Sequence, residues 1–183
     1  MPTFRAIRID KADKGSQASY VDFDDSELMD GDVTVRVSHS TVNYKDGLAI
    51  TGASPVVRRF PMIPGIDFAG TVETSDSPAF KAGDAVVLTG FGVGEQHMGV
   101  LAQKARVKSS WLVPLPTGLT ATQAMAIGTA GFTAQLALLA LEKHGAKPAD
   151  GPLIVTGAAG GVGSIAVALA KKAGWHVIAS TGR

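Results

Sequence analysis

LIVTGAAGGVGS, residues 153–164, is the stretch that decides the fold of the C-terminal third of this chain. Leu153–Val155 are apolar and favour a strand, residues 156–163 form a glycine-rich turn, and residues 164–173 favour a helix because Gly and Pro are absent from the interior. A second apolar run follows at residues 175–179. This order predicts a right-handed βαβ unit, whose turn presents backbone N–H groups and a helix N-terminus to a pyrophosphate.

The glycines of this turn have separate roles. Gly160 lets the backbone approach a phosphate, and Gly163 lets the helix pack closely on the strand. The pattern is A-x-G-x-x-G, because Ala158 stands at the position of the first glycine of the dinucleotide fingerprint. The same loop also fits the TGxxxGxG pattern of short-chain dehydrogenases, through Thr156, Gly157, Gly161 and Gly163. The motif alone predicts nucleotide binding, against a purely structural glycine turn, and leaves the family open.

The end of the second predicted strand indicates which dinucleotide binds. NAD sites place a carboxylate there for the ribose 2′-hydroxyl, whereas a basic residue accommodates a 2′-phosphate. The strand ends in Ser180, Thr181, Gly182 and Arg183, which include no carboxylate and one planar guanidinium. We therefore predict that the cofactor is NADPH. The alternative is that Arg183 is only a surface arginine at a chain end and has no role in cofactor binding.

The predicted nucleotide-binding unit contains two strands. A doubly wound dinucleotide domain has about six strands in two halves. We therefore expect the 183-residue sequence to be a truncated or partial representation of a longer enzyme, and we expect exposed sheet edges.

Composition excludes several other classes of protein. The formal net charge is +1, with 45% hydrophobic and 18% charged residues, so nucleic acid is not an expected partner. The N-terminus lacks the apolar core of a secretory signal, and we expect a cytoplasmic protein. The absence of cysteine excludes disulfides and thiolate zinc ligands. The four histidines have no metal-ligand spacing, so no metal site is expected: His39, His97, His144 and His176.

One long stretch has no charged residue, from Ser109 to Leu141. Proline, glycine, threonine and glutamine interrupt it, so it does not read as about 20 continuous apolar residues. We expect a buried helix here and no membrane span.

Residues 1 to about 115 predict a β-rich, barrel-like region with short strands and closely spaced turns. A first strand is expected at the N-terminus, and later ones at residues 32–38, 65–73, 85–88, 101–107 and 111–113. Residues 90–98 are expected to form a loop, and residues 120–141 the helical link to the nucleotide-binding unit.

The densest polar cluster of this region is NYKD, residues 43–46. A reductase needs hydrogen-bond donors where negative charge develops on a carbonyl oxygen, and Asn43 and Tyr44 are donors. Structural roles are the alternatives: Asp46 as the cap of a helix begun by residues 47–50, and Lys45 as a solvated charge.

Five motifs together carry a family resemblance: NYKD (43–46), FPMIPGIDFAGTV (60–72), GDAVVLTGFGVGE (83–95), IGTAGFTA (127–134) and TGAAGGVGS (156–164). They resemble the zinc-independent, quinone-oxidoreductase-like branch of the medium-chain dehydrogenase/reductase superfamily, and within it the acryloyl-coenzyme A reductase group. The resemblance covers nearly the whole chain. It implies an α/β protein with a GroES-like catalytic barrel at residues 1–119, followed at 120–183 by a helical link and the first βαβ unit of an NADP-binding Rossmann domain.

The resemblance also implies site residues. Ala159, Gly160, Gly161 and Val162 would form the pyrophosphate loop, and residues 180–183 the 2′-phosphate pocket. Tyr44 would lie at the nicotinamide end with Asn43 beside it, and Thr129 would face the cofactor, unless it only packs a helix start. Asp67 stands where zinc-dependent relatives have an acidic residue near the metal, and here we interpret it as structural.

The activity implied is NADPH-dependent reduction of acryloyl-CoA to propionyl-CoA, with hydride transfer to the β-carbon and an unassigned proton donor. The full-length protein is expected to be a homodimer. Two alternatives stay open: a quinone or small enone as substrate, and a non-catalytic fragment.

Overall fold

The computed structural model describes residues 2–13 and 15–182. Its internal contacts divide the chain into two compact units, Met1–Ala126 (unit 1) and Ile127–Arg183 (unit 2). The sequence places the domain boundary slightly earlier, between residues 119 and 120. The architecture is the predicted mixture of a β-rich part and an α/β part.

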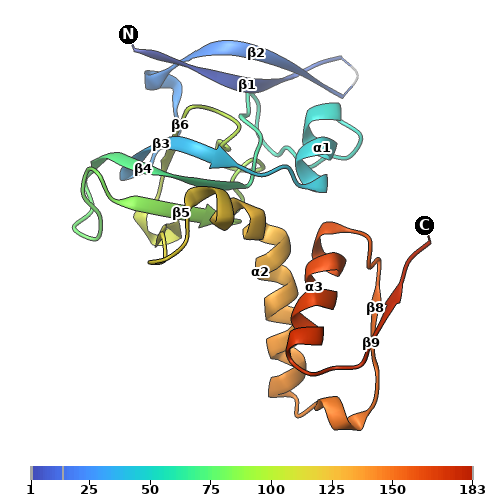
Figure 1. Cartoon of the computed structure of the whole chain (residues 1–183). Coiled ribbons are helices and arrows are strands. Elements are labelled where there is room, and N and C mark those ends of the chain that lie inside the picture. The colour runs from blue at the N-terminus through green and yellow to red at the C-terminus, as the bar shows by residue number, and fades with distance from the viewer. Residues whose placement is uncertain (1, 14, 183) are drawn as a thin grey trace. The chain divides into compact units, whose positions relative to one another are not determined.

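Unit 1 consists of a hairpin and a five-stranded antiparallel sheet (Figure 1). Strands β1 (Thr3–Lys11) and β2 (Ser16–Asp24) form the hairpin. The sheet has the order β6-β3-β4-β5-β7. Its strands are β3 (Val33–Ser40), β4 (Asp67–Ser75), β5 (Ala85–Thr89), β6 (Lys104–Val107) and β7 (Val113–Pro114). The short helices of this unit are η1 (Asp25–Glu27), α1 (Tyr44–Thr51) and η2 (Ser109–Trp111).

The core of unit 1 follows from alternation along the strands. Val33 and Val35 of β3 are buried, and they pair with Val107 and Ala105 of β6. The first core cluster joins them to Phe68, Val72, Val86, Leu88, Val93 and Val100. Each fully buried branched aliphatic side chain of this kind stabilises the fold by about 1.5–3 kcal/mol relative to exposure.

Two strands of unit 1 differ from the prediction. Strand β2 was not among the expected strands, because its sequence SQASYVDFD is largely polar; long-range bridges of its partner β1, from Ile9 to Met62 and from Ala6 to Ala102, hold the hairpin in place. The strand expected at residues 111–113 exists but begins later, since η2 ends at Trp111 and the two-residue strand β7 starts at Val113.

Helix α2 (Ala121–Lys143) contains a break at Gly128, whose φ of 47° and ψ of −161° are not helical. A side chain at this positive φ would be strained, so glycine sets the position of the break. Within the described residues, α2 is the one helix with the length and apolar composition of a membrane span, a criterion that core helices of soluble proteins also meet. The prediction that this helix is buried is wrong for one face of α2.

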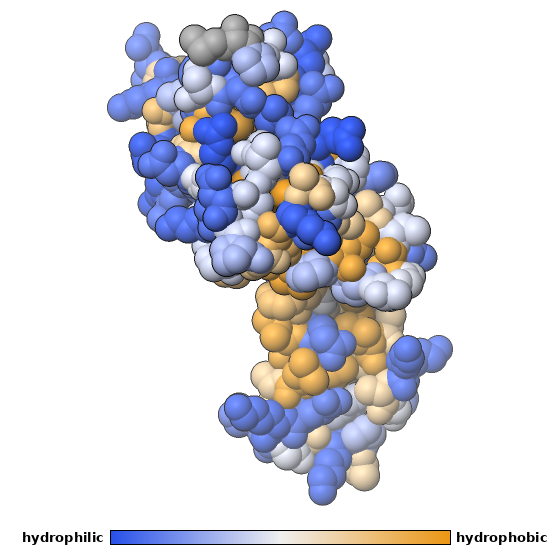
Figure 2. All heavy atoms as spheres, turned by 90° about the vertical axis from the view of Figure 1, so that its left-hand side faces the viewer, coloured by the Kyte–Doolittle hydropathy of each residue, from blue (hydrophilic) through white to orange (hydrophobic). Residues whose placement is uncertain are grey.

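After the break, that face carries large apolar side chains in contact with solvent, namely Phe132, Leu136 and Leu139, and Ile127 before the break is exposed as well. Figure 2 shows apolar side chains gathered over unit 2. On the other face of α2, Ala134 and Leu138 are buried. Composition predicted an apolar helix, but burial depends on what packs against each face.

Unit 2 contains the predicted βαβ crossover. Strand β8 (Leu153–Thr156), helix α3 (Gly161–Lys172) and strand β9 (Val177–Ser180) follow each other, after the short helix η3 (Pro148–Asp150). β8 and β9 are parallel, in a register that pairs Leu153 with Val177. Leu138, Ala170 and Trp175 form the small core beneath them.

Candidate active site

The NYKD cluster forms the first turn of α1, and Asn43 is its N-cap residue. Asn43 has extended backbone angles (φ −104°, ψ 158°), as N-caps require. Its backbone N–H donates to Asp46 Oδ2 at 2.7 Å, the contact of an acidic residue at the third helical position. The interpretation of Asp46 as the cap of a helix beginning at residue 47 is therefore wrong: the helix begins three residues earlier, and Asp46 supports its start from within.

Asn43 also connects α1 to strand β4. Its Nδ2 donates to Asp67 Oδ2 at 2.9 Å. Asp46 and Asp67 are both buried, at 1% and 0% exposure. Burial is the main cause that raises the pKa of Asp46, and the charge of Asp67 adds to it, while hydrogen bonds from Asn43 oppose it. Asn43 thus positions α1 against a buried carboxylate, a link that no local sequence pattern signals because the two residues are 24 positions apart.

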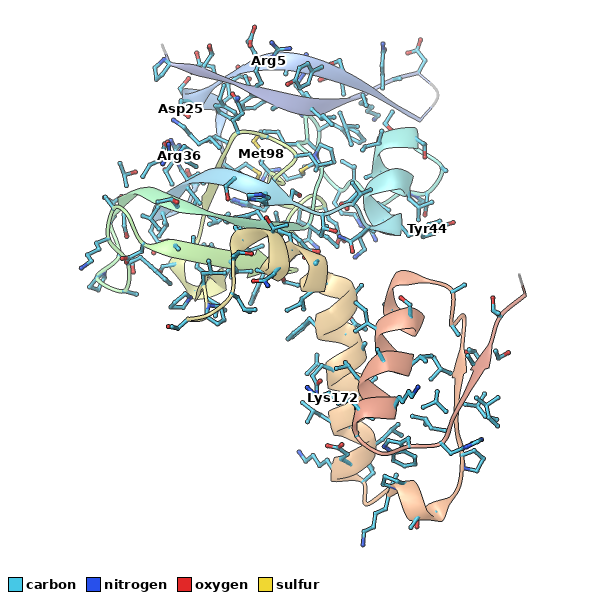
Figure 3. All side chains as sticks on the ribbon, in the orientation of Figure 1. Arg5, Asp25, Arg36, Tyr44, Met98 and Lys172 are labelled. Atoms are coloured by element: carbon cyan, nitrogen blue, oxygen red, sulfur yellow. The ribbon has the colours of Figure 1, made fainter. Side chains whose placement is uncertain are left out.

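Tyr44 follows Asn43 and is 85% exposed within the described chain. Figure 3 shows its side chain at the start of α1, directed away from the body of unit 1. Lys45, predicted as a solvated charge, is half exposed and pairs with Glu95 at 2.8 Å. This pair connects α1 to the loop of residues 90–98. Tyr44 is therefore held on a helix with two side-chain anchors, and its hydroxyl is presented to solvent.

In unit 2 the glycine turn and the segment after β9 line one open cavity of about 460 Å³. Its lining consists of Gly157, Ala159, Gly160, Thr181 and Gly182. The backbone N–H of Ala158 donates to Ser180 O at 3.1 Å, which holds the two segments together. Four of the residues predicted to bind the cofactor thus share one cavity: Ala159, Gly160, Thr181 and Gly182.

Helix α3 begins at this cavity. Gly160 is its N-cap and provides no side-chain cap, so the first N–H groups of the helix are directed toward the turn. Gly163 is the third residue of α3. A Cβ added at this position would overlap the carbonyl oxygen of Gly157 and lie 2.8 Å from Ala158 Cα. The predicted role of Gly163 in close packing matches this geometry.

The other residues predicted to bind the cofactor are not part of the lining of this cavity. Gly161 and Val162 form the first turn of α3, and Ser180 ends β9. Thr129 stands in the first turn after the break at Gly128. Arg183 lies outside the described residues. Tyr44 and Asn43 belong to unit 1, and the cofactor-loop residues to unit 2.

The described residues contain no group of three His, Asp or Glu side chains that could hold a metal ion. His97 is buried, its Nε2 lies 2.8 Å from the carbonyl oxygen of Arg106, and its ring meets the edge of Trp111 at 5.1 Å. Burial is the main cause that lowers the pKa of His97. These contacts are those of a packing residue.

Comparison with known families identifies the β-rich unit. The model of the alcohol dehydrogenase GroES-like domain matches residues 29–117. These residues belong to that family. The GroES-like domain thus includes strands β3 to β7 together with α1 and the NYKD cluster.

Relatives extend the similarity to nearly the whole chain. Acrylyl-CoA reductase AcuI of Ruegeria pomeroyi is 55% identical over 182 residues, which cover 98% of this chain and 55% of the relative. The crystal structure of Escherichia coli K-12 YhdH with bound NADPH has a TM-score of 0.95 and 58% identity, and it covers 97% of this chain and 55% of the other. Bacillus subtilis yhfP, solved with NAD bound, also has a TM-score of 0.95, at 42% identity, with 100% and 56% covered.

The chain therefore spans about half the length of the relatives it matches. The predicted resemblance, a GroES-like domain followed by a Rossmann βαβ unit in an oxidoreductase family, is confirmed.

Proposed function

We propose that the full-length protein is an NADPH-dependent oxidoreductase that reduces the carbon–carbon double bond of acryloyl-CoA to give propionyl-CoA. The observation that carries the proposal is the cavity in which the glycine turn meets a strand end without a carboxylate. The name of the Ruegeria relative supports the substrate, and the NADPH bound to the Escherichia coli structure supports the cofactor. We further propose a cytoplasmic homodimer without a zinc ion.

The residues of unit 2 fit NADPH. Gly157, Ala159 and Gly160 leave room beside the N-terminus of α3, where N–H groups and the helix dipole favour a pyrophosphate. Thr181 and Gly182 line the same cavity and bring no negative charge toward a 2′-phosphate. Ala159–Val162 would hold the pyrophosphate and residues 180–183 the phosphorylated ribose. Thr129 is proposed to contact the cofactor as well.

Bound NADPH supplies the hydride that the reduction needs. The contribution of this chain is to orient the thioester and stabilise the charge that develops on its oxygen. The Tyr44 hydroxyl is the proposed donor to that oxygen. Asn43 holds the helix that carries Tyr44 through its bond to Asp67. The pair is therefore proposed to act at the reacting end, with Asn43 as the positioning residue.

The direct test is oxidation of NADPH by acryloyl-CoA on full-length protein of verified mass, with NADH and a quinone as parallel assays. Turnover with NADPH and acryloyl-CoA well above both other assays supports the proposal. Faster reduction of the quinone than of acryloyl-CoA would instead support a quinone or enone reductase, and no turnover with any acceptor would contradict an oxidoreductase.

Replacing Tyr44 with phenylalanine is expected to lower kcat for acryloyl-CoA by about tenfold and leave the Kd for NADPH unchanged. Loss of one donor in a water-excluded oxyanion site costs about 100- to 1000-fold. A smaller effect is expected here because Tyr44 is 85% exposed in the described chain and water replaces part of the interaction. Steady-state kinetics and a fluorescence titration with NADPH measure the two constants. A kcat equal to that of the wild type would remove Tyr44 from the mechanism.

Replacing Thr181 with aspartate is expected to shift the ratio of kcat/KM for NADPH over NADH by about 10- to 100-fold toward NADH. A carboxylate at the end of β9 would repel the 2′-phosphate and accept a hydrogen bond from a free 2′-hydroxyl. Thr181→Asn is the matched control, since it has nearly the same shape as aspartate without the charge. Equal ratios in the two variants would show that charge at residue 181 does not select the cofactor.

A further inference from the structure

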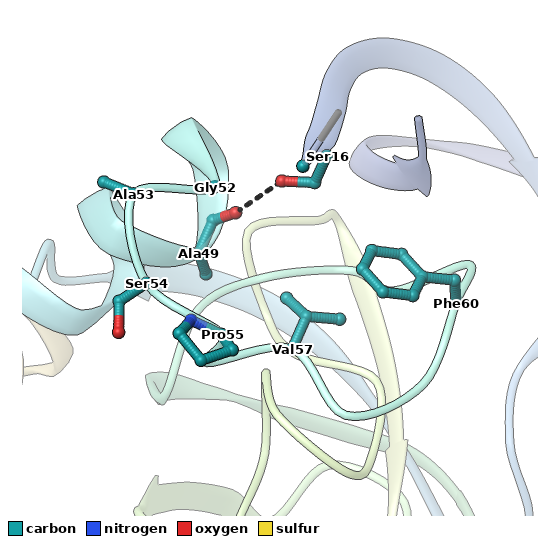
Figure 4. Close-up of a pocket in the computed structure, with 9 residues that line it drawn as sticks. Ser16, Ala49, Gly52, Ala53, Ser54, Pro55, Val57 and Phe60 are labelled. Carbon is teal, nitrogen blue, oxygen red and sulfur yellow. Dashed lines mark hydrogen bonds between the residues drawn. The ribbon is translucent and has the colours of Figure 1, made fainter. Parts of the chain in front are cut away.

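Unit 1 contains a second cavity, of about 310 Å³, at the opposite end of α1 from Tyr44. Figure 4 shows how it forms where the end of α1 meets the hairpin turn and the loop of residues 53–60. Ala49 of α1 and its C-cap Gly52 line the cavity, together with Ser16 from the hairpin and with Pro55, Val57 and Phe60 from the loop. The Oγ of Ser16 donates to Ala49 O over 3.4 Å, a long bond that leaves this polar pair accessible to a stronger partner.

The loop that forms one side of the cavity carries an aromatic ring in the lining and two cationic residues next to it in the sequence. Phe60 lines the cavity and is 40% exposed, so part of the residue is accessible to a ligand there. Arg58 and Arg59 precede it in the same loop, and both are exposed. Neither forms an ion pair with another residue that the structure describes. An apolar slot with an aromatic ring and a hydroxyl in its lining, and with two exposed arginines in the loop beside it, suits a purine base that carries phosphates.

The spacing along α1 matches one substrate. The helix has eight residues and is about 12 Å long. It therefore separates Tyr44, at the proposed reacting end, from the cavity by about that distance. The phosphopantetheine arm of a coenzyme A thioester has a main chain as long as about five extended residues and reaches about 17 Å. A thioester placed at Tyr44 can thus place its nucleotide in this cavity.

We propose that this cavity binds the adenosine 3′,5′-bisphosphate end of the coenzyme A thioester. Phe60 stacks on the adenine, and Arg58 and Arg59 bind its phosphates. The assignment rests on the proposed function, which it extends from the acyl group to the part of the substrate that distinguishes an acyl-CoA from a quinone or a small enone.

The test compares two substrates of the full-length protein at saturating NADPH: acryloyl-CoA and acryloyl-pantetheine, which lacks the nucleotide. We expect the KM of acryloyl-pantetheine to exceed that of acryloyl-CoA by about 10- to 100-fold. This is the loss of affinity expected when one stacked base and its phosphate contacts are removed. The double variant R58S/R59S is expected to raise the KM of acryloyl-CoA toward that of acryloyl-pantetheine and leave the constants of acryloyl-pantetheine unchanged. Phe60→Ala is expected to act in the same direction.

The control variant R5S/R8S removes the same two charges from strand β1, where Arg5 pairs with Asp22 and Arg8 with Asp10. It is expected to leave both KM values unchanged. Equal KM values for the two thioesters in the wild type, or an equal loss for both thioesters in R58S/R59S, would overturn the assignment while the proposed reductase activity stands. No reduction of either thioester would overturn the proposed function and this assignment together.

Discussion

Replacing Gly163 with alanine is expected to destabilise helix α3 by about 1–3 kcal/mol and to weaken NADPH binding by about 100-fold or more. The added Cβ would overlap the carbonyl oxygen of Gly157, and it would lie 2.8 Å from Ala158 Cα and from Gly157 C. These are backbone atoms of the turn itself, so no flexible side chain can move aside. Either the helix shifts outward or the turn changes shape, and both displace the N–H groups proposed to bind the pyrophosphate.

Gly161→Ala provides a matched control for the fold. Both glycines lie in the first turn of α3, and both gain similar helix propensity on replacement by alanine, up to about 1 kcal/mol. At Gly161 the new Cβ would lie 3.4 Å from the Cβ of Ala130, an ordinary packing distance. The difference between the two variants therefore isolates the overlap with the turn.

Hydrogen exchange of the α3 amides measures the local stability of this helix, and fluorescence titration measures the Kd for NADPH. Protection of α3 is expected to fall in Gly163→Ala and to be kept in Gly161→Ala. Equal protection in both variants, with unchanged NADPH affinity in Gly163→Ala, would mean that the turn accommodates a side chain and that the close approach has no functional role.

The βαβ unit was predictable because its signals are local. Residues 153–164 contain a short apolar run, a glycine turn and an uninterrupted helix start, and each of these restricts the backbone within a few residues. The same reasoning located most strands of the sheet in unit 1, since DVTVRVS alternates apolar and polar residues in the period of a strand.

What the sequence did not predict depends on contacts between distant residues. Strand β2 has a polar sequence and is recognised only from its pairing with β1. The start of α1 at Tyr44 depends on Asn43, which is tied to Asp67, and on Lys45, which pairs with Glu95 fifty positions away. The exposed face of α2 has the composition of a core, and only the structure tells which side chains are covered.

Replacing Asn43 with aspartate is expected to lower the stability of unit 1 by more than 2 kcal/mol at neutral pH, and by much less in mild acid. Aspartate is as good an N-cap as asparagine and has the same shape, so the start of α1 is conserved. The change replaces the Nδ2 donor, 2.9 Å from Asp67 Oδ2, with a second carboxylate oxygen. A lost hydrogen bond to a charged group costs about 1.5–3 kcal/mol, and repulsion between the new, half-buried carboxylate and the buried one of Asp67 adds to this.

The pH dependence distinguishes this mechanism from a general loss of packing. Two carboxylates that share a site raise the pKa of one of them above its value in the unfolded chain, about 3.9. A group whose pKa is raised by folding contributes stability that is present below the unfolded pKa and is lost as pH rises through the folded pKa. The difference in unfolding free energy between wild type and variant should therefore grow as the pH rises from 4.5 to 7.5.

The chain has two tryptophans, Trp111 in unit 1 and Trp175 in unit 2. In a Trp175→Phe background, the fluorescence of Trp111 therefore reports the unfolding of unit 1 when the 183-residue chain is titrated with urea. Asn43→Ser is the control: serine caps helices well but is too short to reach Asp67, and it brings no charge, so its difference from wild type should vary much less over this pH range than that of Asn43→Asp. Asp46 is present in all three proteins, but its pKa, which burial raises and hydrogen bonds from Asn43 lower, is expected to rise in both variants because both lose the Nδ2 donor. A loss of unfolding free energy in Asn43→Asp that does not depend on pH and parallels that in Asn43→Ser would mean that the contact between residues 43 and 67 contributes through shape alone. The positioning role proposed for Asn43 would then have no electrostatic basis.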